Sequence, residues 1–129
     1  MMRHRVNGAT ALVVALSGAT AVVFGAFGAH ALRGLLDGQG MQTWHTGVEY
    51  HFWHTLALFA AALGLPAGGG RKAAIVLFAV GIVLFSGSLY ALTLGAPRWV
   101  GIITPVGGLA FIAGWLAAGW SLARGASTN

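Results

Sequence analysis

Long apolar stretches separated by short polar breaks make up most of the chain. Four of them are long enough to cross a bilayer as helices, at about residues 8–29, 47–65, 73–94 and 104–122. Crossing the hydrocarbon layer takes roughly 20 helical residues. The stretches do not show the alternating pattern of barrel strands. The pattern therefore predicts an all-α fold, a four-helix transmembrane bundle, with residues 1–129 forming a single domain.

The breaks between these stretches contain residues that end or start helices. Pro66, followed by three glycines and the pair Arg71 and Lys72, predicts a tight polar turn after the second helix. Thr104 and Pro105 predict an N-cap followed by proline at the first position of the fourth helix.

The longest connection, residues 30–46, has weak helical patterning of its own. Its leucines have helical spacing, at Leu32, Leu35 and Leu36. Arg33 and Asp37 form an i,i+4 pair of opposite charge. We therefore predict a short interfacial amphipathic helix between helices one and two, followed by a turn at Gly38, Gln39 and Gly40.

Composition agrees with a membrane protein, because the chain is 57% hydrophobic and only 7% charged, whereas soluble domains are about one quarter charged. The net charge of +5 comes from basic residues at the ends of apolar runs, where they favour contact with anionic lipid headgroups over nucleic acid. There are no cysteines, which excludes disulfides and thiolate metal sites. We predict no cofactor.

The basic residues also predict the orientation. With four spans, one side carries the larger group, Arg3, Arg5, Arg71, Lys72 and Arg124, and the other carries Arg33 and Arg98. The positive-inside rule places both termini in the cytoplasm, and we expect a multi-pass protein of the bacterial inner (plasma) membrane. The first stretch and its Ala29-His30-Ala31 end resemble a signal peptide, but the stretch exceeds the usual 7–15 residues of such a segment. We therefore expect it to be retained.

Small residues recur every four positions on two of the predicted helices. The first helix carries Ser17, Ala21, Gly25 and Ala29, and the fourth carries Ala110, Gly114 and Ala118. Such stripes let helix backbones approach closely in lipid. We expect them to pack the bundle, although the same spacing would serve a homodimer. Ser86, Gly87 and Ser88 give the third helix a similar point of close approach.

The second helix carries the ionisable residues nearest to membrane depth. Glu49 shares an edge with His45, and a different edge presents Tyr50, His51 and His54. A site for a ligand or a proton is one interpretation, since such groups usually face the bundle interior or a water path. The structural alternative, which we favour, places Glu49 in the first turn, where a carboxylate complements the helix N-terminus, with Arg33 or Arg98 as a partner.

A metal site at His51 and His54, with His30 and His45 as further candidates, rests on weak evidence, because zinc takes three or four ligands and the sequence establishes no third. Paired carboxylates, a nucleophile with a base, and a phosphate loop are likewise not recognisable. We predict no metal site, no catalytic residues and no enzymatic activity.

Four sequence motifs in order along the chain resemble the YgdD-like family of small bacterial inner-membrane proteins, a domain of unknown function with mitochondrial relatives. They are GAFGAHAL at 25–32, TGVEY at 46–50 with His54, LFSGSLY at 84–90, and TPVGG at 104–108 with Gly114 and Trp115. His51 stands where members of that family often carry glutamine. The resemblance implies four transmembrane helices and a retained first helix, and no established activity.

The polar residues of these motifs are our candidate ligand-binding cluster: His30, Glu49, Tyr50, His54, Ser86, Ser88, Tyr90 and Thr104. The predicted topology brings four motif ends to the non-cytoplasmic face. We therefore expect a non-enzymatic binding or accessory protein whose partners are the lipid bilayer and either another copy of itself or another membrane protein. The alternative is a small oligomeric proton-linked transporter or carrier. A membrane enzyme is the least favoured class.

Overall fold

The computed structural model describes residues 6–127, and this part of the chain is helical apart from short connections. The elements in order are α1 (Gly8–His30), α2 (Gly38–Gly64), α3 (Gly69–Gly81), the π-helix η1 (Ile82–Ser86), α4 (Gly87–Thr93), the 3-10 helix η2 (Arg98–Ile102) and α5 (Ile103–Ser127). Because α3, η1 and α4 follow without a break, they form one long helix with a π-helical turn inside it.

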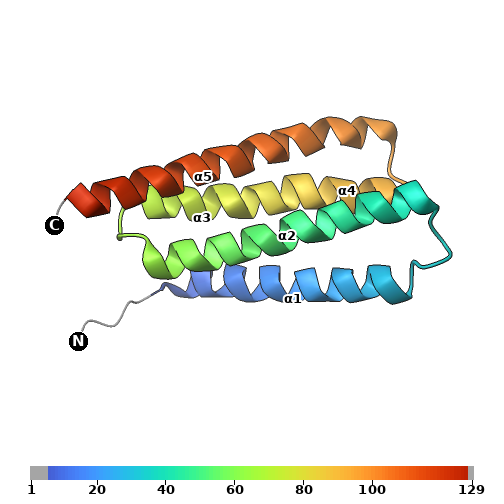
Figure 1. The fold of residues 1–129 in the computed structure, drawn as a ribbon, viewed down its shortest axis with the longest axis horizontal. Helices are drawn as coiled ribbons and strands as arrows, with labels where there is room; N and C mark the ends of the chain where they lie inside the picture. The colour runs from blue at the N-terminus through green and yellow to red at the C-terminus, as the bar shows by residue number, and fades with distance from the viewer. Residues whose placement is uncertain (1–5, 128–129) are drawn as a thin grey trace.

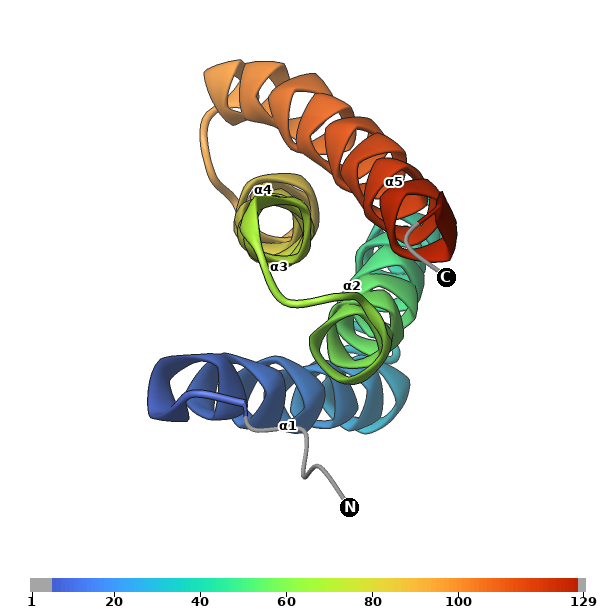
Figure 2. The same ribbon diagram turned by 90° about the vertical axis from the view of Figure 1, so that its left-hand side faces the viewer.

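The long helices lie side by side along the long axis of the molecule (Figure 1). The start of α1 and the end of α5 lie at the same end of the bundle (Figure 1). Viewed from that end, α2 lies beside α1, and the α3–α4 helix lies beside α5 (Figure 2). Helix α2 also packs on α3, η1 and α4, whereas α1 and α3 touch little. Helix α2 therefore joins the two halves of the bundle.

Three of the described helices are long and apolar enough to cross a membrane: Gly8–His30, Gly69–Thr93 and Arg98–Gly125. They match the first, third and fourth predicted spans. Helix α2 is as long, at 27 residues, but its first half carries polar residues such as Gln42, His45 and Glu49, which lower its mean hydropathy.

The connection between α1 and α2 differs from the prediction. Residues 31–37 form a turn with Gly34 at φ +89°, and no separate interfacial helix is present there. Helix α2 starts at Gly38, where we predicted a turn. The Asp37 carboxylate caps it by accepting a hydrogen bond from the Gly40 N–H at 2.6 Å. The extra turns are held by Trp44, which is buried and donates its indole N–H to the Phe24 carbonyl at 2.9 Å.

Two other helices begin at residues different from those predicted. The third long helix begins at Gly69 instead of residue 73, directly after Gly68, whose φ of +142° makes the turn. Helix α5 begins at Ile103 and continues η2, so Thr104 is not an N-cap. Its hydroxyl is used instead in a hydrogen bond to the Ser88 hydroxyl at 2.5 Å.

The core is apolar at one end of the bundle and mixed at the other. Near the α2–α3 turn the buried residues form one hydrophobic cluster, made up of Ala57, Leu58, Ala61, Leu65, Ala74 and Phe78. Toward the other end Leu32, Trp44 and Tyr90 form a second cluster. The polar contacts lie between and around these two clusters, in the middle of the bundle. The expected stripe on α1 packs as predicted at Ala21, which is buried, but Gly28 and not Ala29 faces the neighbouring helix.

Candidate functional site

His51 is the centre of a hydrogen-bonded group that joins three helices. Its side chain is 3% exposed. Its Nδ1 lies 2.9 Å from the Tyr90 hydroxyl of α4, and its Nε2 lies 2.9 Å from the Ser17 carbonyl of α1. The Thr20 hydroxyl is 3.2 Å from the same Nε2. The imidazole therefore links α1, α2 and α4 through the interior.

The partners fix the tautomer of His51. A carbonyl only accepts hydrogen bonds, so Nε2 carries the hydrogen that is donated to Ser17. Nδ1 is then the acceptor, and Tyr90 donates its hydroxyl to it. One turn along α2, Thr55 donates its hydroxyl to the His51 carbonyl at 2.8 Å and accepts from the Ser17 hydroxyl. Polar groups at this level thus satisfy one another within the protein.

Two serines on the third long helix bind its neighbours, as the Ser86-Gly87-Ser88 segment predicts. Ser86 is fully buried and donates to the Gly47 carbonyl of α2 at 2.7 Å. Ser88 donates back to the Phe85 carbonyl at 2.8 Å and accepts from Thr104 of α5. These bonds surround η1, where a π-helical turn leaves backbone groups out of the regular pattern.

His54 lies on the side of α2 that faces α5. Trp115 donates its indole N–H to His54 Nε2 at 3.0 Å, so Nδ1 carries the hydrogen and donates to the Tyr50 carbonyl at 2.8 Å. The imidazole stacks on Phe111 with ring centres 3.6 Å apart. Tyr50 also packs among aromatic rings, including Phe85 at 4.6 Å. His54 and Tyr50 are therefore parts of an aromatic contact between α2 and α5.

The histidine geometry does not favour a metal at this level. Both nitrogens of His51 and both nitrogens of His54 are engaged by protein groups. Among the described residues, no three histidine or acidic side chains are grouped as metal ligands. Nor does any buried side-chain polar atom in the described part lack a hydrogen-bond partner. The interior network is thus complete without a ligand.

Glu49 does not lie in the first turn of its helix, where the sequence analysis placed it. Because α2 starts at Gly38, Glu49 is about 16 Å along the helix and not in its first turn. A contribution to the helix N-terminus is therefore the wrong explanation, since that effect fades within one turn. Glu49 and His45 share an edge, as predicted, and this edge is exposed on the outside of the bundle. His30 is also exposed, at the end of α1.

The eight candidate residues therefore do not form one site. Tyr90 bonds to His51, and Ser86, Ser88 and Thr104 make separate hydrogen bonds between helices in the interior, whereas His54 and Tyr50 belong to the contact with α5. Glu49 and His30 lie outside both. Sequence reasoning missed the central role of His51 and the contributions of Ser17, Thr20, Thr55 and Trp115. Hydroxyls inside an otherwise apolar first helix were the available signal.

Removing the Tyr90 hydroxyl tests whether the network stabilises the bundle. Tyr90→Phe leaves the buried Nδ1 of His51 without its donor. We expect a loss of about 1–2 kcal/mol in the free energy of unfolding, measured by thermal or denaturant unfolding in mild detergent. Tyr50→Phe is the matched control, because the Tyr50 hydroxyl makes no hydrogen bond within the described residues. Equal stabilities of the two variants would show that the His51–Tyr90 bond contributes nothing.

Known proteins similar to this chain are membrane proteins. A family model described as "Protein of unknown function (DUF423)" matches residues 24–108. The chain is 47% identical to the UPF0382 membrane protein YwdK of Bacillus subtilis, over 79% of this chain and 85% of that protein. It is 44% identical to the UPF0382 inner membrane protein YgdD of Escherichia coli, over 81% of each. No solved structure matches the chain.

Proposed function

Because this chain belongs to the DUF423 family of membrane proteins of unknown function, we propose for it a non-enzymatic binding role in the membrane, exerted as an assembly of two copies. The assembly forms through the α2 outer face, which we define by its exposed residues Gln42, His45, Glu49, Phe52, Trp53, Leu56, Phe59, Ala60 and Leu63. The observation that carries the proposal is the position of Glu49. The chain has only two acidic residues, and this one is exposed on the outside of the bundle, eleven residues along α2.

Packing against α1 supports the depth of Glu49. A Cβ on Gly25 would lie 3.4 Å from Val48 Cγ1, so Glu49 is level with the part of α1 near Gly25. That level is five residues, or about 7 Å, inside the end of α1 at His30. With α1 crossing about 30 Å of hydrocarbon, Glu49 is within the apolar layer. A carboxylate at such depth is costly unless a protein group or water meets it.

A second copy of the same chain is the partner that the face itself favours. His45 lies one helical turn from Glu49 on the same edge. In two parallel α2 helices related by a twofold axis the two Glu49 residues lie at the same level, and each carboxylate reaches the other chain's imidazole about 6 Å along the axis. Interhelical hydrogen bonds of this kind drive association in lipid. Below them, Trp53 and Leu56 are each 53% exposed and supply apolar contact. The face is thus complementary to itself.

Single cysteines test this assembly, since the natural chain has none. We expect Leu56→Cys, on the α2 outer face, to give a disulfide-linked dimer on mild oxidation in native membranes. Leu116→Cys is the matched control, because Leu116 of α5 is also an exposed leucine, at 70%. Cross-linking at both positions to the same extent would indicate random collision and contradict the proposal, as would cross-linking at neither.

The proton-linked carrier is the second candidate function, and the chemistry of the proposed pair favours it. In the proposed pair, two Glu49 and two His45 side chains meet inside the membrane, and ionisable groups at such depth are typical of proton paths. Vesicles loaded with a pH-sensitive dye separate the two functions. Proton flux that disappears on substitution of Glu49 indicates a carrier, and a proton-tight dimer indicates a binding protein.

The proposal includes a topology for the whole chain. Helix α2 packs against α1 and the third long helix, and it contacts α5 through the side chain of His54. These contacts with the three apolar helices support α2 as the fourth crossing and a multi-pass arrangement. With four crossings, the N-terminal and C-terminal ends of the bundle lie on the same side of the membrane. Arg71, Lys72 and Arg124 favour the cytoplasm for that side, while Arg3 and Arg5 lie outside the described residues. The E. coli relative's name supports a location in the inner membrane.

A further inference from the structure

Two cavities adjoin along the side of the bundle between α1 and the third long helix. One has a volume of about 620 Å³ and the other about 460 Å³, and both are lined by Val13 of α1 and Ala79 of α3. We call them together the α1–α3 groove. The groove exists because α1 and α3 barely touch, and α2 forms part of its floor through Ala62 and His51. It lies away from the α2 outer face, so a ligand can occupy it whether or not the proposed dimer forms.

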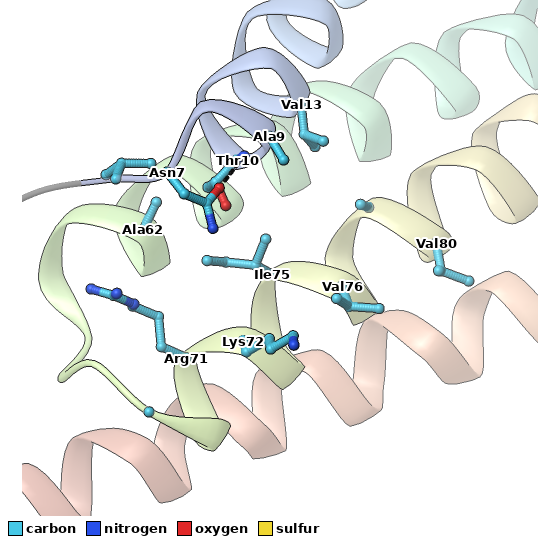
Figure 3. A pocket seen from close by; sticks show the side chains of 13 residues that line it. Asn7, Ala9, Thr10, Val13, Ala62, Arg71, Lys72, Ile75, Val76 and Val80 are labelled. Carbon is cyan, nitrogen blue, oxygen red and sulfur yellow. Dashed lines mark hydrogen bonds between the residues drawn. The ribbon is translucent and has the colours of Figure 1, made fainter.

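The walls of the groove are mainly apolar between its two ends. Between its ends it is lined by aliphatic side chains of α1, α3 and η1, including Val13, Leu16, Ile75, Val76, Val80 and Val83. Figure 3 shows Val13 and Thr10 of α1 on one side of the larger cavity and Ile75 and Val76 of α3 on the other. The imidazole of His51 is part of the floor, but its nitrogens are occupied by Tyr90 and Ser17. The groove thus suits a hydrocarbon chain.

One end of the groove is polar and basic. Arg71 and Lys72 line it there, together with Asn7 and Thr10 (Figure 3). Neither of the chain's two acidic residues, Asp37 and Glu49, lines the groove. A phosphate group is the natural partner of two adjacent cations at a membrane surface.

The distance between the basic end and the middle of the groove matches one leaflet. From Lys72 to Val83 the helix advances eleven residues, about 16 Å, and half of the hydrocarbon layer measures about 15 Å. A ligand whose phosphate lies at Lys72 therefore ends its chain near the bilayer midplane.

We infer that the α1–α3 groove is a binding site for an anionic membrane phospholipid, with the phosphate at Arg71 and Lys72 and one acyl chain along Val13, Ile75 and Ala79. The basic end selects the headgroup charge, and the apolar walls hold the chain. The site faces the leaflet at the α2–α3 turn, which the proposed topology makes the cytoplasmic one.

The test is lipid binding to the full-length protein in mild detergent, followed by native mass spectrometry. Phosphatidylglycerol and phosphatidylcholine with identical acyl chains are the two probes. We expect the wild type to prefer phosphatidylglycerol by at least about tenfold, and Arg71→Gln with Lys72→Gln to abolish that preference. Arg33→Gln with Arg98→Gln is the charge-matched control, because it removes two exposed cations from the other end of the bundle.

A second pair of variants tests the groove itself. Ala79→Phe fills the groove where the two cavities meet, and it should reduce retention of both lipids by at least about fivefold. Ala73→Phe adds the same bulk to an exposed position of α3 outside the groove and should leave retention unchanged.

Three results would overturn the inference. The first is an unchanged lipid preference after removal of Arg71 and Lys72. The second is equal retention in Ala79→Phe and Ala73→Phe when both variants elute as folded protein. The third is binding of inorganic phosphate that displaces phosphatidylglycerol while Ala79→Phe has no effect, which would assign the basic end to a free anion.

Discussion

Replacement of Gly107 by alanine is expected to separate α5 from the third long helix and to destabilise the bundle more than any other single added methyl group. A Cβ at this position would lie 2.3 Å from the backbone nitrogen of Phe85 and 2.7 Å from its Cα. Backbone atoms of a packed helix cannot turn away as a side chain can. Overpacking usually costs roughly 1–3 kcal/mol. We expect Gly107→Ala to lower the free energy of unfolding by about 3 kcal/mol or more.

The control for this change is the adjacent residue. A Cβ on Gly108 would meet only Phe85 Cδ2, at an ordinary contact distance of 3.8 Å. Alanine is the better helix former at both positions, so the difference between Gly107→Ala and Gly108→Ala isolates the clash. Unfolding of the two variants in the same detergent measures it. Equal stability would mean that α5 does not approach η1 as closely as described.

The second large effect is expected at Glu49. In the proposed dimer each Glu49 is met by His45 of the other copy. Glu49→Leu removes both interhelical contacts, each worth about 1–2 kcal/mol in model membrane peptides. The dimer should therefore dissociate at least about tenfold more readily. Fluorescence energy transfer between labelled copies, diluted stepwise into lipid vesicles, measures the change.

Two further variants make this result specific. Asp37→Asn removes the other acidic charge while keeping an oxygen that caps α2 at Gly40, and it should dimerise like the wild type. Glu49→Gln keeps hydrogen bonding but loses the charge, and we expect an intermediate affinity. If Glu49→Leu dimerises as tightly as the wild type, Glu49 does not hold the copies together. If it fails to fold, Glu49 is needed within the single chain.

Hydrophobic patterning was a reliable guide where helices are apolar and end at glycine or proline. The first helix begins at Gly8 as predicted, and the second ends just before Pro66. Patterning predicted the start of α2 at the wrong residue. Polar residues such as Gln42 and His45 occupy an exposed face there, so the first turns of the helix do not belong to an apolar stretch. What extends the helix is the insertion of Trp44 against Phe24 and Gly28 of α1, a contact between residues distant in sequence.

Composition and periodicity were enough to establish the class of this protein: an all-α membrane protein with short connections, small residues at helix contacts and a scarcity of charge. Composition and periodicity depend only on which residues the chain contains and in what order, so they can be determined without knowing how the helices pack. The division of polar residues between the interior and the outer surface became visible only in the packed bundle. Glu49 and His51 are two residues apart on one helix, yet His51 is 3% exposed within a satisfied network and Glu49 lies on the outer surface. The rotation of α2 against α1 and α4 sets that difference, and it arises from packing between helices that are far apart along the chain.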